Sequence, residues 1–267
     1  MRLSKTVVRN RRLVAPVLRG IVRGGIRRGP ELRHHVLRDA WTVAKRFGAE
    51  AVVNIEKREI PCVQEAVVEG YIDDHQRLML AALARGLHCR SFFEIGTNRG
   101  RTAWTVARNN PQLQVYTLDV PAQAEISSMA LGLDTDDLNA FRPGEVCGEA
   151  FRGTPEAERI TQLLGDSATF DFSAHVGGVD FVYVDGAHTY DYVRTDTHNA
   201  LQMLSPTGTI AWDDYGSNPD VYSLVNELAP SLDRPVYHVF GTRMALYSRQ
   251  DFVVRRPYDD HSSLPTV

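Results

Sequence analysis

Apolar residues follow two patterns along this chain, and the pattern changes near residue 90. In residues 71–87, apolar positions recur at the spacing of one helix face, which predicts a helix. Further on, short apolar runs alternate with helix-like stretches. We predict strands at 91–95, 115–118, 160–164, 179–184 and 209–212, and helices at 101–109, 189–204 and 219–229. Such alternation is typical of a parallel sheet covered by helices on both faces.

Two late apolar runs, 236–240 and 244–247, are separated by only Gly241, Thr242 and Arg243. A crossover between parallel strands needs a longer connection, so these two runs are predicted to form an antiparallel hairpin. The predicted fold is a Rossmann-like, doubly wound α/β sheet of seven strands, mostly parallel and ending in this hairpin. We place this domain at 61–250, with a basic helical arm at 1–60 and a tail at 251–267.

Charge also divides the chain, with a boundary near residue 46. Residues 1–46 hold thirteen Lys or Arg and two acidic residues, whereas the remainder holds 17 bases and 31 acids. In residues 4–28, arginines are interleaved with apolar positions at helical spacing, which predicts a basic amphipathic helix, and a second helix is predicted at 31–47. One interpretation of 4–28 is peripheral contact with an anionic membrane surface. The other is an arm that packs on its own domain or on a sister subunit of a homo-oligomer, with a transit peptide or nucleic-acid contact as further alternatives.

The cysteines and the lengths of the apolar runs bear on the compartment. Cys62, Cys89 and Cys147 are odd in number and widely spaced, which fits a reducing compartment better than a disulfide framework or a zinc site. No apolar run approaches 18 residues, so no membrane-spanning helix is predicted. We therefore expect a cytoplasmic protein.

The first candidate site is a glycine loop between a predicted strand and a predicted helix. It includes Glu94, Gly96, Gly100 and Thr102, and its two glycines are separated by three residues. Glycine lets the backbone approach a ligand closely and adopt a positive φ. The spacing differs from the G-x-G-x-x-G of dinucleotide dehydrogenases, which argues against that class. Taken alone, such a loop is equally compatible with a purely structural turn.

Two further turns follow the next predicted strands. Asp119 ends one strand about 20 residues after the glycine loop, where a carboxylate can accept both hydroxyls of a ribose. A helix-capping role for Asp119 is the alternative. The next strand leads into Gly165, Asp166 and Ser167, a small polar turn suited to the edge of an adenine ring.

With these motifs, residues 70–250 resemble the class I S-adenosylmethionine (SAM) methyltransferases. The resemblance is to the divalent-metal-dependent O-methyltransferase branch, which includes catechol, caffeoyl-CoA, macrolide-sugar and cephalosporin-tailoring enzymes. It implies that SAM is the cofactor and that Asp119 holds its ribose. The predicted cofactor-binding residues are Glu94, Gly96, Thr97, Gly100, Thr102, Asp119, Asp166 and Ser167.

A second constellation consists of carboxylates at the ends of two buried strands. Asp185 follows one predicted strand, and Asp213 and Asp214 follow another. Neighbouring parallel strands place such residues side by side, and three clustered carboxylates repel one another unless a cation neutralises them. Oxygen ligands suit Mg²⁺, with Mn²⁺ as a substitute. In the resembling enzymes the corresponding positions hold the metal, so the resemblance implies that Asp185, Asp213 and Asp214 are metal ligands. A structural turn at Asp213 and Asp214 is the alternative.

His188 occupies the position three residues after the first predicted metal ligand. In the catechol and caffeoyl-CoA enzymes a lysine base stands there, so the sequence departs from that pattern. Histidine can act as a base near neutral pH, and we predict that His188 and Asp185 are catalytic. A metal ligand and a helix-capping residue are the alternatives for His188. The segment 121–158 is predicted to be a lid or a specificity insert.

The function that the sequence favours is metal-assisted methylation of a hydroxyl on a small molecule or sugar. One alternative is a metal-independent SAM methyltransferase that acts on another small acceptor. A third is a non-catalytic, membrane-associated scaffold with the SAM fold, against which the intact Gly96, Gly100 and Asp119 count. The acidic body, without an evident basic groove, argues against a nucleic-acid substrate.

Overall fold

The computed structural model describes residues 36–37, 71–121, 124–140, 147–239 and 242–250. Its centre is one eight-stranded sheet with the order β1-β7-β8-β6-β5-β2-β3-β4. The strands are β1 (Val36–Leu37), β2 (Ser91–Ile95), β3 (Gln114–Asp119), β4 (Ile160–Leu164), β5 (Val179–Val184), β6 (Leu204–Trp212), β7 (Tyr237–Val239) and β8 (Ala245–Ser248). Only β8 runs antiparallel to its neighbours, β6 and β7. The predicted doubly wound sheet with a closing hairpin is thereby confirmed.

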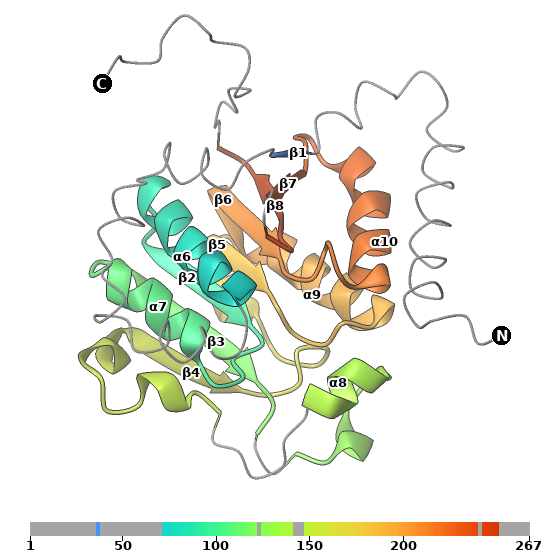
Figure 1. Ribbon diagram of the computed structural model, residues 1–267, viewed down its shortest axis with the longest axis horizontal. Coiled ribbons are helices and arrows are strands. Elements are labelled where there is room, and N and C mark those ends of the chain that lie inside the picture. The colour runs from blue at the N-terminus through green and yellow to red at the C-terminus, as the bar shows by residue number, and fades with distance from the viewer. Residues whose placement is uncertain (1–35, 38–70, 122–123, 141–146, 240–241, 251–267) are drawn as a thin grey trace, which may run out of the picture.

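Helices cover both faces of this sheet (Figure 1). The α-helices are α6 (Tyr71–Gly86), α7 (Arg101–Asn109), α8 (Thr135–Ala140), α9 (Tyr190–Met203) and α10 (Pro219–Leu228). Short 3-10 helices lie at Ile126–Ser128, Glu149–Phe151, Pro155–Arg159, Ser173–His175 and Ala229–Ser231. Four of the α-helices match the predicted helical ranges to within two residues. In Figure 1, α8 lies apart from them, beyond one edge of the sheet.

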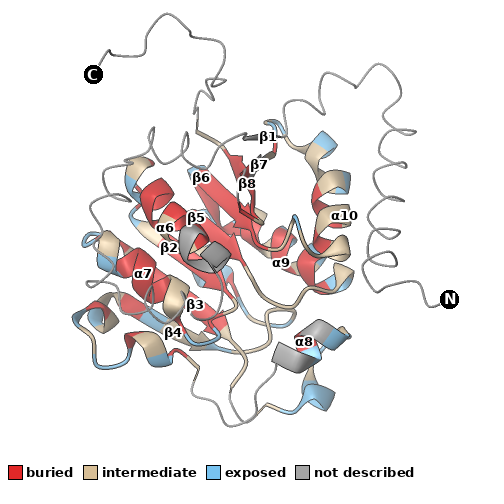
Figure 2. Ribbon diagram, viewed as in Figure 1, coloured by how far each residue is buried: buried red, intermediate tan, exposed pale blue. Residues whose placement is uncertain are grey.

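The strands contribute alternate residues to two separate hydrophobic cores. Figure 2 shows that the central strands are buried. On one face, Phe92 and Phe181 pack with α6 and α7, and their rings stack with centroids 5.3 Å apart. On the other face, Phe93 and Val182 pack with α9 and α10. A strand that is buried on both faces presents a continuous apolar run, which is why these strands could be located in the sequence.

Local sequence signals explain where two of the helices begin. The Oδ1 atom of Asn218 accepts hydrogen bonds from the backbone N–H groups of Asp220, at 2.8 Å, and Val221, and Pro219 occupies the first turn of α10. This is a favourable N-cap arrangement. α7 begins after Gly100, which has a φ of 78° that a residue with a side chain adopts only with strain.

The N-terminal region differs from the prediction at two residues. A helix was expected at 31–47, but Val36 and Leu37 form β1, which pairs in parallel with β7 and makes the sheet eight-stranded. The rest of that predicted helix, the predicted basic helix at 4–28 and the tail at 251–267 lie outside the described residues. None of the helices within the described part of the chain is long and apolar enough to cross a membrane.

Candidate active site

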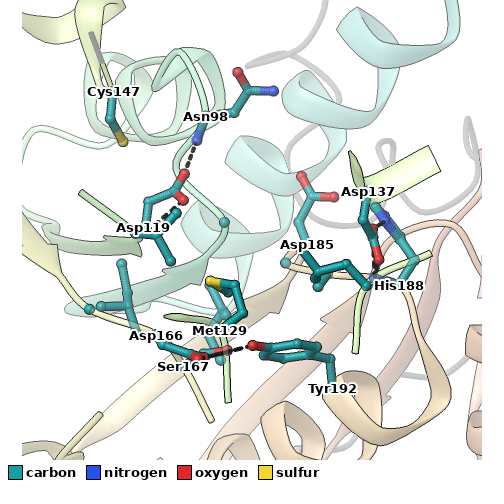
Figure 3. Close-up of a pocket in the computed structure, with 18 of the residues that line it drawn as sticks. Asn98, Asp119, Met129, Asp137, Cys147, Asp166, Ser167, Asp185, His188 and Tyr192 are labelled. Atoms are coloured by element: carbon teal, nitrogen blue, oxygen red, sulfur yellow. Dashed lines mark hydrogen bonds and ion pairs between the residues drawn. The ribbon is translucent and has the colours of Figure 1, made fainter. Parts of the chain in front are cut away.

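The carboxyl ends of β2, β3, β4 and β5 surround a cavity of about 280 Å³. Ligands of open α/β sheets bind at this edge. Part of the 121–158 segment lies over the cavity, because Met129, Leu133 and Asp137 line it. Figure 3 shows Asp119 and Asp185 on opposite sides of the cavity, with Asp166 and Tyr192 below them. The remaining lining residues include Gly96, Asn98, Arg99, Cys147, Ser167, Gly186, Ala187 and His188.

The two loop glycines have different roles. Gly96 lines the cavity with a φ of 101°, and a Cβ atom placed there would lie 1.9 Å from the backbone oxygen of Asp185. Gly96 therefore allows the loops after β2 and β5 to meet. A Cβ atom on Gly100 would lie 2.6 Å from Cε1 of Phe151. Gly100 was predicted to contact the cofactor, but it is absent from the described cavity wall and instead accommodates the Phe151 ring.

Several hydrogen-bond donors hold the Asp119 carboxylate. Its Oδ2 atom accepts from the backbone N–H of Asn98 at 2.6 Å, and its Oδ1 atom accepts from Val120 at 2.7 Å. The backbone N–H of Thr97 and the Cys147 thiol also hydrogen-bond this carboxylate. Burial raises the pKa of Asp119, and these donors counter that effect. Asp119 lines the cavity in this arrangement.

Asn98 and Cys147, which also face Asp119, were not predicted. Asn98 has a φ of 45°, a left-handed conformation that Asn tolerates better than most residues, and this conformation lies within the loop that directs its N–H at Asp119. Burial and the neighbouring Asp119 raise the pKa of the Cys147 thiol to about 12. Cys147 is thus a neutral thiol in this part of the cavity.

Three predicted cofactor residues stabilise the site from behind its wall. Glu94 is 1% exposed and accepts a hydrogen bond from the Thr117 hydroxyl at 2.6 Å, and Thr117 in turn lies 2.6 Å from the Thr97 hydroxyl. Thr102 hydrogen-bonds Glu94 from the start of α7. Burial raises the pKa of Glu94 to about 8, although the Thr117 hydrogen bond opposes that shift. These residues connect β2, β3 and α7 and do not line the cavity.

The opposite end of the cavity is formed by the turn after β4. Asp166 and Ser167 line the cavity there, as predicted. Asp166 accepts hydrogen bonds from the backbone N–H of Ala130 at 2.7 Å and from the Tyr192 hydroxyl at 3.0 Å. Asp166 therefore attaches the overlying segment to the cavity rim.

Asp185 presents its carboxylate to the cavity (Figure 3). No hydrogen bond to this side chain is found among the described residues. Burial, together with the negative charge of Asp213, raises the pKa of Asp185 well above its usual range. Asp185 is thus a carboxyl group at the cavity surface, within reach of a ligand bound there.

His188 lies between two carboxylates. Its Nδ1 atom is 2.7 Å from Oδ1 of Asp137, and its Nε2 atom is 3.1 Å from Oδ2 of Asp214. Burial alone would lower the pKa of His188, but the two carboxylates outweigh burial and raise it to about 11. The two carboxylates therefore favour the imidazolium form, with Nδ1 hydrogen-bonded to Asp137 and Nε2 within ion-pair distance of Asp214. Of the three roles that the sequence left open for it, this arrangement favours a structural one over a base or a metal ligand.

Asp213 and Asp214 lie behind the cavity wall and are paired with positive side chains. Asp213 accepts a hydrogen bond from Nε2 of Gln76 at 2.9 Å, and its Oδ2 atom lies 3.5 Å from an Arg243 nitrogen. Asp214 lies 3.2 Å from Nε of Arg243. Burial opposes the ionisation of Asp214, but His188, Ser217 and Arg243 together lower its pKa to about 2.

The expected juxtaposition of the three carboxylates is present, because Asp213 and Asp214 both act electrostatically on Asp185. The contacts of these carboxylates do not support the predicted metal site. Within the described parts of the chain, no three His, Cys, Asp or Glu side chains form a group that could hold a metal ion. The oxygens of Asp213 and Asp214 instead contact Gln76, Arg243 and His188. In this arrangement the three predicted ligands do not fit a divalent ion.

Comparison with known proteins finds one family model. Residues 93–215, a little less than half of the chain, match a model described as a methyltransferase domain. They include the loop after β2, Asp119, Asp166, Asp185 and both carboxylates after β6. The match shows that this segment is similar to methyltransferase domains. No curated protein sequence matches the chain.

Solved structures share the fold at low sequence identity. The O-methyltransferase NovP is 16% identical, with a TM-score of 0.50 over 68% of this chain and 81% of that protein. The O-methyltransferase from Bacillus cereus, solved with SAH, is 17% identical, with a TM-score of 0.46 over 71% and 88% of the two chains. TomG from Streptomyces achromogenes, an O-methyltransferase solved with SAM, is 18% identical, with a TM-score of 0.44 over 64% and 78%.

Proposed function

We propose that this protein transfers the SAM methyl group to a hydroxyl on a small molecule or sugar. The observation that carries the proposal is the placement of two carboxylates in one cavity. Asp119 lines one side of the cavity, where its carboxylate can face a ribose, and Asp185 lines the other side without a hydrogen bond from the described residues. The cofactor and Asp185, which would accept the proton, would therefore occupy different parts of the cavity.

Asp119, the Gly96 loop and the turn at Asp166 and Ser167 would hold the cofactor. Its ribose would lie against Asp119, where the hydrogen bonds from Asn98 and Val120 fix both carboxylate oxygens. Its adenine would lie at Ser167, on the same rim of the cavity. Bound SAM supplies a methyl group on a positively charged sulfur, which is already electrophilic.

Asp185 would act on the acceptor. Asp185 would take the acceptor's O–H proton on a carboxylate oxygen, and the acceptor oxygen would take the methyl group that bound SAM supplies. The products would be a methyl ether, SAH and protonated Asp185. Because the enzyme mainly has to align the two reactants, the covering segment at 126–140 contributes by enclosing them.

Metal assistance is the second candidate, and one observation favours it: the Asp185 carboxylate faces the cavity and accepts no hydrogen bond from the described residues. A divalent ion could bind there only if Arg243 and His188 left the two neighbouring carboxylates. The metal-binding experiment described below distinguishes this candidate from the reaction without a metal ion.

The test is a transfer assay with the full-length enzyme, SAM and a panel of catechols and sugars, scored by SAH release and by the mass of the product. We expect wild-type enzyme to methylate at least one hydroxyl acceptor. Asp185→Asn should lower kcat by about 100-fold or more, in line with the usual contribution of a general base, while SAH affinity stays within about twofold. Asp171→Asn, at an exposed carboxylate outside the cavity wall, is the matched control and should retain full activity. Methylation of amine acceptors alone, or full turnover by Asp185→Asn, would contradict the proposal.

A further inference from the structure

Arg243 connects the sheet's closing hairpin to the acidic pair after β6. It lies between β7 and β8, and its guanidinium group approaches Asp214 at 3.2 Å and Asp213 at 3.5 Å. The hairpin is held in this position by Gln76 on α6, which is 2% exposed. The Gln76 side chain donates to Asp213 at 2.9 Å and accepts from the backbone N–H of Arg243. Arg243 is therefore fixed through both its backbone and its side chain.

His188 approaches the same acidic pair from the opposite side. Asp214 has one carboxylate oxygen directed at Arg243 and the other at Nε2 of His188. Its backbone has a φ of 53°, a conformation that is unfavourable for most residues with side chains. Three elements, the hairpin, the loop after β5 and the loop after β6, thus meet at this one carboxylate.

Arg243, whose guanidinium group is always charged, lies against both carboxylates of the acidic pair, and the His188 ring lies against Asp214. A divalent ion placed among these carboxylates would lie close to the guanidinium group and be repelled by it. An added ion would therefore have to displace Arg243 and His188 from the oxygens that it needs.

The following inference rests on the proposed function. We infer that Arg243 and His188 supply this active site with the positive charge that a divalent metal ion would otherwise provide. The two side chains neutralise Asp213 and Asp214. Asp185 is left as the one carboxylate of the three that faces the cavity without a hydrogen-bond partner among the described residues. Arg243 is in this view a positioning residue, because it acts on Asp185 through Asp213 and Asp214 and is absent from the described cavity wall.

The inference is tested by metal binding, independently of turnover. Full-length protein is freed of metal with a chelator and titrated with Mn²⁺, and binding is followed by the loss of the free-ion electron paramagnetic resonance signal. We expect wild-type protein to show no stoichiometric site, and its methyl transfer to persist in excess chelator. Arg243→Gln removes one positive charge and should raise Mn²⁺ affinity by about tenfold or more, which corresponds to about 1.4 kcal/mol. Arg194→Gln removes an arginine whose side chain is 64% exposed and should bind Mn²⁺ as wild type does.

Two results would overturn the inference. One is a wild-type protein that binds one Mn²⁺ per chain and loses that ion in Asp213→Asn. The other is an Arg243→Gln variant that binds SAH as wild type does but gains no Mn²⁺ affinity. The first result needs no Arg243 variant, so the test stands even if that variant fails to fold. Failure of SAH binding by wild-type protein would instead contradict the proposed function, so the two failures are distinguishable.

Discussion

The Nδ1 atom of His188 lies 2.7 Å from Oδ1 of Asp137, and this ion pair attaches the helix α8 to the active site. The backbone N–H of His188 also donates to Asp137, at 3.0 Å. Asp134 and Asp137 exchange backbone-to-carboxylate hydrogen bonds at the start of α8, an arrangement that resembles a capping box. The Asp137 carboxylate therefore both takes part in capping this short helix and holds His188.

Removal of the Asp137 charge should loosen α8. A hydrogen bond to a charged group contributes about 1.5–3 kcal/mol, so Asp137→Asn should speed amide exchange in residues 130–140 by about tenfold or more. Hydrogen–deuterium exchange monitored by mass spectrometry measures this directly. Exchange around β2 and β5 should stay unchanged, and Asp171→Asn is the control. Unchanged exchange in α8 would mean that the ion pair does not hold this helix in place.

Gly96 should tolerate a side chain far less well than Gly132 does. Gly96→Ala would place a Cβ atom 1.9 Å from a backbone oxygen, so we expect loss of SAH binding or of folding. Gly132→Ala is the matched control, because nothing lies within 4 Å of its Cβ position and its backbone does not require a positive φ. Thermal unfolding with and without SAH compares the two variants. A Gly96→Ala protein with wild-type melting and SAH affinity would refute this account of the loop.

Glu94 should make folding depend on pH. Its pKa is raised from 4.5 to about 8 in the folded chain, so the folded state holds this proton more tightly than the unfolded state does. Stability linked to Glu94 is therefore fully present below pH 4.5 and is lost progressively as pH rises to about 8. Glu94→Gln should remove this loss, and its stability relative to wild type should rise over that interval by a few kcal/mol at most, since one pKa unit corresponds to about 1.4 kcal/mol. Urea unfolding across the interval measures the difference, and a pH-independent difference would contradict the assigned pKa.

The sheet was predictable because its strands are short apolar runs with helical segments between them. The ranges 91–95 and 179–184 match β2 and β5, since buried parallel strands have no polar face to obscure their limits. The range 160–164 matches β4, a partly exposed strand at the edge of the sheet. β6 begins at Leu204, five residues before the predicted start, because the run Ser205-Pro206-Thr207-Gly208 is typical of a turn. β1 has only two residues, too few to show a period, and its pairing with β7 is non-local.

The candidate site was predictable where a residue lies at or just beyond the carboxyl end of a strand. Asp119, Asp166 and Asp185 met that condition, and all three line the cavity. Asp137 lies in an acidic insert without periodicity, so nothing in the sequence connects it to His188. Arg243 comes from the hairpin turn, and its contact with Asp214 depends on the antiparallel placement of β8 beside β6. The charge pairing of the acidic cluster therefore emerged only from the tertiary structure.

Calorimetric titration of SAM and SAH into full-length wild-type protein and Asp119→Ala tests the central claim most directly. Two hydrogen bonds to a largely buried carboxylate are removed in this variant, so its affinity for both ligands should fall by about 30- to 1,000-fold, or about 2–4 kcal/mol. Circular dichroism checks that the variant is folded. The account predicts one site per chain in wild-type protein and this loss in the variant. Wild-type protein that binds neither ligand, or a folded Asp119→Ala protein with unchanged affinity, would contradict it.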